Sequence, residues 1–128
     1  MINNERLINE FLELVQIDSP SSKEGAVAKV LVEKLEKIGC EVLIDDAGLK
    51  TGGETGNIIA RLKGNRPGRK LLFSSHMDTV SPGIGVKPII DEVNGIIKSD
   101  GTTVLGSDDK VGIAAILEGL RAIKENNI

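Results

Sequence analysis

Residues 76–78, His-Met-Asp, contain the only imidazole of the chain and place a carboxylate two positions after it. They follow the short apolar run 70–75, and ligand sites in open α/β sheets lie beyond the carboxyl ends of strands. In an extended backbone, residues two apart point the same way, so Asp78 can hydrogen-bond the ring nitrogen of His76 that does not face a metal. Imidazole and carboxylate are both zinc ligands. The alternative is a plain surface histidine at a strand end, because the His-x-Asp pattern is short and common.

A second acidic segment, residues 107–110 (Ser-Asp-Asp-Lys), opens the last helical stretch of the sequence. Acidic residues in a first turn are favoured by the helix dipole, which explains Asp109. Asp108, just before it, is explained equally well as an N-cap. Taken alone, this segment therefore favours helix capping over metal binding. No stretch fits a phosphate-binding P-loop, and no serine near His76 is set on the strained turn that a nucleophile needs.

The composition is that of a single globular domain, with 128 residues, 40% of them apolar and 27% charged. Two Phe and no Trp or Tyr imply an aliphatic core and argue against a stacking platform for single-stranded nucleic acid. The net charge of −3 and the scattered basic residues argue against binding a phosphate backbone. No segment predicts a membrane span or a signal peptide. We therefore expect a cytoplasmic protein with no nucleic-acid or membrane partner.

Helical spacing of apolar residues predicts the three elements that frame these motifs. They cover residues 4–17, about 24–38 and 109–124. Ser21 with Glu24 three residues later predicts a capping box at the start of the second helix, and Gly39 predicts its end.

Strands are predicted where short apolar or alternating runs lie between turn signals. These are residues 40–45, 57–63 and 70–75, with two short extended pieces near 89–91 and 95–98. The continuous apolar run 70–75 predicts a strand buried on both faces. The Gly-rich residues 48–56 predict a loop. This order of elements indicates an α/β domain in which helices pack on a sheet.

Taken together, residues 74–80 (Ser-Ser-His-Met-Asp-Thr-Val) and 99–115 (Ser-Asp-Gly-Thr-Thr-Val-Leu-Gly-Ser-Asp-Asp-Lys-Val-Gly-Ile-Ala-Ala) resemble the zinc-dependent exopeptidase family of peptidase T, carboxypeptidase G and acetylornithine deacetylase. Residues 17–21 are similar to the opening of that family, so the resemblance covers nearly the whole chain. Within the family, the chain looks most like the peptidase T-like tripeptide aminopeptidases. The resemblance implies a layered helix-sheet-helix catalytic domain of the zinc exopeptidase type, of which this chain is the N-terminal portion.

The resemblance also implies a role for each matching residue. His76 would bind one of two zinc ions, and Asp108 would bridge both. Asp78 would be a catalytic residue that holds the His76 ring. Asp109 would follow Asp108 through a cis peptide bond and is not assigned to the metal. The zinc ions would activate a water for attack on the peptide bond.

Other ligands of the family have no counterpart in residues 1–128. These are an adjacent Glu-Glu pair, a more distal carboxylate and a late histidine. Two zinc ions need about four ligands each, shared ligands and water included, whereas His76 and Asp108 supply two protein ligands. We therefore expect residues 1–128 to be the N-terminal part of a metallopeptidase catalytic domain. The remaining catalytic segment and the smaller lid or dimerisation domain would lie outside it, and the isolated chain would be inactive.

The expected activity of the longer protein is that of a di-zinc aminopeptidase that releases the N-terminal residue of short peptides. Whether the longer protein forms a homodimer through the smaller domain is left open. Two alternatives also stay open: a related amidohydrolase, such as a deacetylase or a carboxypeptidase, and a catalytically inactive fragment or binding module. An unpaired sheet edge and an uncovered helix face predict self-association of the chain.

Overall fold

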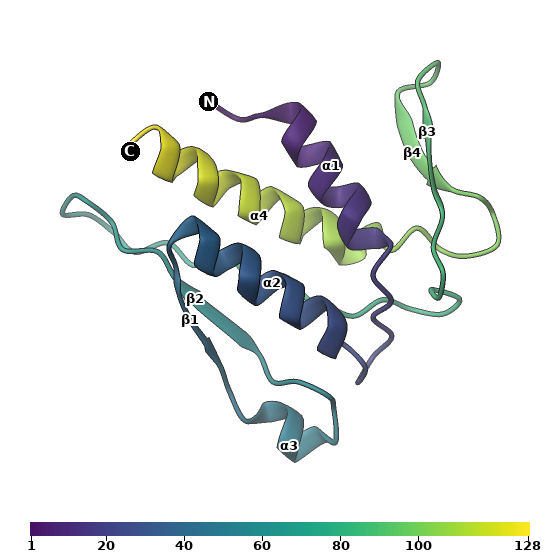
Figure 1. Cartoon of the computed structure of the whole chain (residues 1–128), viewed down its shortest axis with the longest axis horizontal. Coiled ribbons are helices and arrows are strands. Elements are labelled where there is room, and N and C mark those ends of the chain that lie inside the picture. Colours follow the sequence, from purple (N-terminus) through teal and green to yellow (C-terminus); the bar gives the residue numbers. More distant parts are fainter.

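Three long helices lie side by side and form the body of the molecule (Figure 1). They are α1 (Asn4–Val15), α2 (Gly25–Ile38) and α4 (Ser107–Glu125). The computed structural model describes residues 1–128. α4 contacts both α1 and α2, and it lies between them in Figure 1. All three predicted helices are confirmed, each within a few residues of the expected ends.

The helix ends agree with local sequence signals, with one exception. Gly39 ends α2 in the left-handed conformation, with φ of 99°, as predicted. The capping box predicted for Ser21 and Glu24 is wrong, because α2 has no side-chain cap. The Glu24 carboxylate instead accepts a hydrogen bond from the backbone N–H of Ser22 at 2.7 Å. The hydroxyl of Ser21 is therefore left for another partner.

The apolar faces of the three helices meet in a single core, which the low aromatic content makes almost wholly aliphatic. Fully burying one such side chain contributes roughly 1.5–3 kcal/mol. The core contains Phe11, Leu14, Val15, Val27, Leu31, Leu35, Ile38, Cys40, Val86, Ile113, Ala114 and Leu117. The start of α4, which carries the second acidic motif, is anchored in this core through Ile113 and Ala114.

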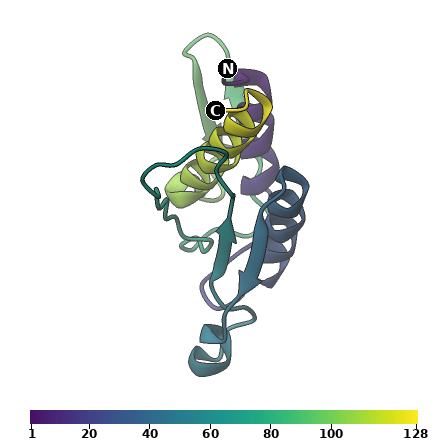
Figure 2. The same ribbon diagram turned by 90° about the vertical axis from the view of Figure 1, so that its left-hand side faces the viewer.

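Four strands form two separate antiparallel pairs. β1 (Glu41–Ile44) pairs with β2 (Ile58–Arg61), so that Glu41 lies opposite Arg61. β3 (Pro88–Asp91) pairs with β4 (Ile96–Ser99) as a hairpin. Figure 2 shows the β1–β2 pair alongside α2, with which both strands are in contact. These strands confirm four of the predicted extended segments and, with the helices, the predicted mixed α/β fold.

Two predictions about the elements are wrong. The loop predicted over residues 48–56 begins inside a short helix, α3 (Ala47–Thr51). The strand predicted over residues 70–75 forms no ladder, and Leu71, Leu72 and Phe73 are 78%, 93% and 58% exposed. An apolar run becomes a buried strand only where other strands and helices cover it. No strand of residues 1–128 pairs with residues 70–75.

Candidate metal-binding site

His76 lies within hydrogen-bond distance of both other predicted site residues, Asp78 and Asp108. Nδ1 of His76 is 3.0 Å from Oδ1 of Asp78 and also 3.0 Å from the backbone oxygen of Asp78. On the other side of the ring, Nε2 of His76 is 2.9 Å from Oδ1 of Asp108. The imidazole thus lies between two carboxylates that are 30 positions apart in the sequence. Its pKa is raised above the ordinary histidine value, mainly by the hydrogen bond to Asp108.

The backbone after His76 is held against the connection between α1 and α2. Thr79 forms an isolated parallel bridge with Pro20, and its backbone N–H donates to the carbonyl of Ser19 at 2.9 Å. Thr79 also packs against Gly106, where an added Cβ would lie 3.1 Å from Cγ2 of Thr79. The loop that contains His76 is therefore fixed next to the turn that leads into Asp108.

Lys110 joins the start of α4 to the same connection. Its side chain is only 1% exposed, and its ammonium group donates a hydrogen bond to the carbonyl of Ile17. Burial lowers the pKa of Lys110, although the nearby carboxylate of Asp18 opposes this shift. A buried ammonium group is tolerated when its hydrogen bonds are satisfied. This contact brings the second acidic motif beside the first.

Asp108 does not cap α4. The cap position is Gly106, with φ of 77°, and no side chain makes a capping hydrogen bond there. Asp108 and Asp109 both have non-helical backbone angles, and the peptide bond between them is cis, as the family resemblance implied. The N-cap interpretation of Asp108 is therefore wrong. Its side chain is 93% exposed beside His76.

Asp109 faces a different partner. Its Oδ2 accepts a hydrogen bond from Oγ of Ser75 at 2.6 Å. Gly112, one turn further along α4, leaves room for this carboxylate, because an added Cβ would lie 2.4 Å from Oδ1 of Asp109. The two adjacent aspartates are thus separated, with Asp108 beside His76 and Asp109 bound to Ser75.

Ser21 is a site residue that the sequence pattern assigned to a different role. Its Oγ donates a hydrogen bond to Oδ2 of Asp78 at 2.6 Å. This bond is the largest cause that holds the pKa of Asp78 below its ordinary value, and the charge of His76 acts in the same direction. The only sequence signal for this role was the family-like segment 17–21, since Ser-x-x-Glu spacing points to a helix cap.

The donor atoms of His76 and Asp108 fit part of a zinc site. They supply one imidazole nitrogen and one carboxylate oxygen that lie 2.9 Å apart at the surface. Asp78 supplies the outer carboxylate that commonly fixes the second nitrogen of a zinc-binding histidine. No group of three or more His, Cys, Asp or Glu side chains in the chain could hold a metal ion. The residues present therefore fit two ligands of a metal, not a closed site.

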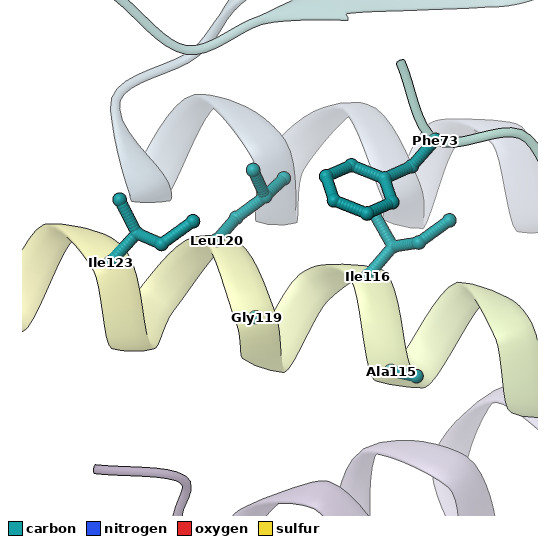
Figure 3. Close-up of a pocket in the computed structure, with 6 residues that line it drawn as sticks. All are labelled: Phe73, Ala115, Ile116, Gly119, Leu120 and Ile123. Atoms are coloured by element: carbon teal, nitrogen blue, oxygen red, sulfur yellow. The ribbon is translucent and has the colours of Figure 1, made fainter. Parts of the chain in front are cut away.

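A separate apolar groove of about 170 Å³ runs along α4. It is lined by Phe73 and by five residues of the helix: Ala115, Ile116, Gly119, Leu120 and Ile123 (Figure 3). Figure 3 shows the ring of Phe73 over Ile116. None of the three predicted site residues lines this groove. No helix of the chain has both the length and the apolar content needed to span a membrane.

The chain is similar to several known proteins. It is 50% identical to the protein YqjE of Bacillus subtilis over all 128 residues, which is 34% of the length of YqjE. A tripeptidase from Staphylococcus aureus superposes on the whole chain with a TM-score of 0.95 and 47% identity. The aminopeptidase PepT from Bacillus cereus superposes on 99% of it with a TM-score of 0.94 and 50% identity. The chain spans 34% of each of these two structures.

The match to a family covers both motifs of the site. The sequence model described as Peptidase family M28 matches residues 57–128, a segment that contains His76, Asp78 and Asp108. This segment is more than half of the chain. The similarity to peptidase T-like proteins that the motifs predicted is confirmed by the two solved structures. The protein therefore belongs to peptidase family M28.

Proposed function

We propose that this chain supplies part of the metal site of a zinc aminopeptidase that acts on short peptides, as in peptidase T. The observation that carries the proposal is the arrangement Asp78–His76–Asp108, with separations of 3.0 and 2.9 Å on the two sides of one imidazole. The names tripeptidase and aminopeptidase of the similar structures support the substrate class.

Each of the three side chains has a distinct task in this proposal. Asp78 accepts the Nδ1–H of His76, so that Nε2, which hydrogen-bonds to Asp108 in this structure, would be the nitrogen that binds a metal ion after it loses its proton. Asp108, whose Oδ1 faces that nitrogen, would supply an anionic carboxylate to the metal ions. Zinc, when bound, would lower the pKa of a water molecule and polarise the scissile carbonyl.

The proposal extends to the longer protein. Residues 1–128 would be the N-terminal part of the catalytic domain, and the remaining zinc ligands would come from other segments. Two observations support this division: only two metal ligands are present, and the chain spans 34% of the similar structures. The complete site would hold two zinc ions, and this chain alone would not hydrolyse peptides. We place the protein in the cytoplasm, in keeping with a substrate of short peptides.

The test is a zinc titration of the chain and of three variants, with a chromophoric chelator as competitor. His76→Ala and Asp108→Ala are each expected to weaken zinc binding at least about tenfold, because each removes a direct ligand and the loss of an outer partner alone typically costs that much. Asp46→Ala is the matched control, since Asp46 is an exposed carboxylate paired with Lys50 away from the site. Equal zinc affinity in the chain and in His76→Ala would contradict the proposal. Tripeptide hydrolysis by the chain alone would contradict the proposed division of the site.

A further inference from the structure

The carboxylate of Asp78 is held at both of its oxygens. Oδ1 lies 3.0 Å from Nδ1 of His76, and Oδ2 accepts the hydroxyl hydrogen bond of Ser21 at 2.6 Å. The terminal torsion of an aspartate is broad, so a carboxylate bound through one oxygen can rotate. A second bond to the other oxygen restricts that rotation. Ser21 therefore decides how the plane of the Asp78 carboxylate meets the imidazole.

Ser21 is suited to this task because its backbone is fixed and its hydroxyl has no other partner. The residues just before it are anchored by the N–H of Thr79, which donates to Ser19, and by Lys110, which donates to Ile17. The helix that follows takes no cap from Ser21. A group that orients a ligand must itself be held by its surroundings, and this connection meets that requirement.

We propose that Ser21 is a positioning residue of the metal site, which acts on the metal only through Asp78 and His76. Its hydroxyl fixes the Asp78 carboxylate, the carboxylate fixes the His76 ring, and the ring directs Nε2 toward the ion. This inference rests on the proposed function, because it concerns the ion that His76 would bind.

A double-mutant cycle on zinc affinity tests the inference. Changes to outer partners of metal ligands typically weaken metal binding about 10–100-fold, and this range is expected for Asp78→Ala. Ser21→Ala removes one of the bonds that hold Asp78, so we expect a smaller loss, of about 3–10-fold. In the Asp78→Ala background, Ser21→Ala should have no further effect, because its only route to the metal is gone. Equal losses in both backgrounds, or no loss in either, would overturn the inference.

Two further variants separate positioning from a general structural effect. Ser21→Thr keeps a hydroxyl and should retain the zinc affinity of the unaltered chain. Ser22→Ala is the matched control, because Ser22 is the adjacent serine and contacts Glu24 through its backbone N–H rather than its hydroxyl. A loss of affinity in Ser22→Ala equal to that in Ser21→Ala would mean that the connection, not the hydroxyl, is responsible.

A metal-free measurement keeps this inference separate from the proposed function. The chain has one histidine, so 15N NMR reports a single imidazole. We expect an Nδ1–H cross-peak protected by Asp78 in the chain and in Ser21→Thr, and broadened by exchange with water in Ser21→Ala. A cross-peak unchanged in Ser21→Ala would overturn the role of Ser21, whatever the zinc result. Zinc binding that does not depend on His76, with the cross-peak behaving as expected, would refute the metal site and leave the positioning intact.

Discussion

Nε of Arg6 on α1 lies 2.6 Å from Oε2 of Glu118 on α4, and that carboxylate is only 1% exposed. The backbone N–H of Asn3 donates to the other oxygen of Glu118 at 2.7 Å. Arg6 also pairs with Glu125, about two turns further along α4. A buried carboxylate is tolerated only when its oxygens are hydrogen-bonded, so this pair holds the N-terminus of α1 on α4. The contact matters to the site because α4 carries Asp108.

Removal of the Glu118 carboxylate should destabilise the fold. Glu118→Ala deletes the hydrogen bonds from Arg6 and Asn3 and leaves a gap in a buried position. Hydrogen bonds to charged groups contribute about 1.5–3 kcal/mol, so we expect a loss of about 2 kcal/mol in the free energy of unfolding. Urea unfolding followed by circular dichroism measures it. Glu125→Ala, which removes the exposed partner of Arg6, serves as control and should shift the midpoint far less.

The same pair predicts a pH dependence of stability. The Arg6 hydrogen bond lowers the pKa of Glu118, while burial acts in the opposite direction. Because the folded-state pKa is lower than the unfolded one, the stabilisation is present above the ordinary glutamate pKa of 4.5 and is lost as the pH falls through the folded value. The difference in unfolding free energy between the chain and Glu118→Gln should therefore shrink from pH 7 to pH 3. A difference that is constant across this range would show that folding does not shift the pKa of Glu118 and would contradict this prediction.

Two glycines of α4 should respond differently to alanine. Gly119 has no atom within 4 Å of an added Cβ, so Gly119→Ala should stabilise the helix by about 1 kcal/mol. At Gly112 the added Cβ would displace the carboxylate of Asp109, which would lose its bond to Ser75. That loss offsets the helix gain by about 1 kcal/mol, and Gly112→Ala should be nearly neutral. In a Ser75→Ala background the two substitutions should become equally stabilising, which thermal unfolding of the four variants can check.

The exposed apolar segment 70–75 predicts concentration-dependent self-association. Leu71 and Leu72 are largely exposed, and Phe73 borders the apolar groove of α4. Contiguous apolar patches of this kind mark surfaces that associate. The variant that combines Leu71→Lys with Leu72→Lys should remain monomeric by light scattering at concentrations where the chain associates. Val93→Lys, a 95% exposed position on the β3–β4 hairpin, is the control and should associate as the chain does. A monomeric chain at high concentration would contradict this prediction.

The helices and the short-range part of the site could be predicted because they depend on neighbouring residues. Apolar spacing placed all three long helices, and Gly39 marked the end of α2 because only glycine adopts its positive φ without strain. The pairing of His76 with Asp78 follows from a spacing of two in extended backbone. The Ser21–Glu24 pattern failed because the same hydroxyl could serve a nearby N–H or a distant carboxylate, and local spacing cannot rank the two.

The sequence by itself thus determined the secondary structure of the helices, the aliphatic core and the chemistry of the candidate ligands, all of which depend on residue type and local spacing. Only the tertiary structure decided that His76 meets Asp108, that Ser21 holds Asp78, and that residues 70–74 stay exposed. The first two are contacts between segments more than 30 positions apart, which arise from how α4 and the connection after α1 pack together. The third depends on which surfaces cover an apolar run, and burial is a property of the assembled fold rather than of the run.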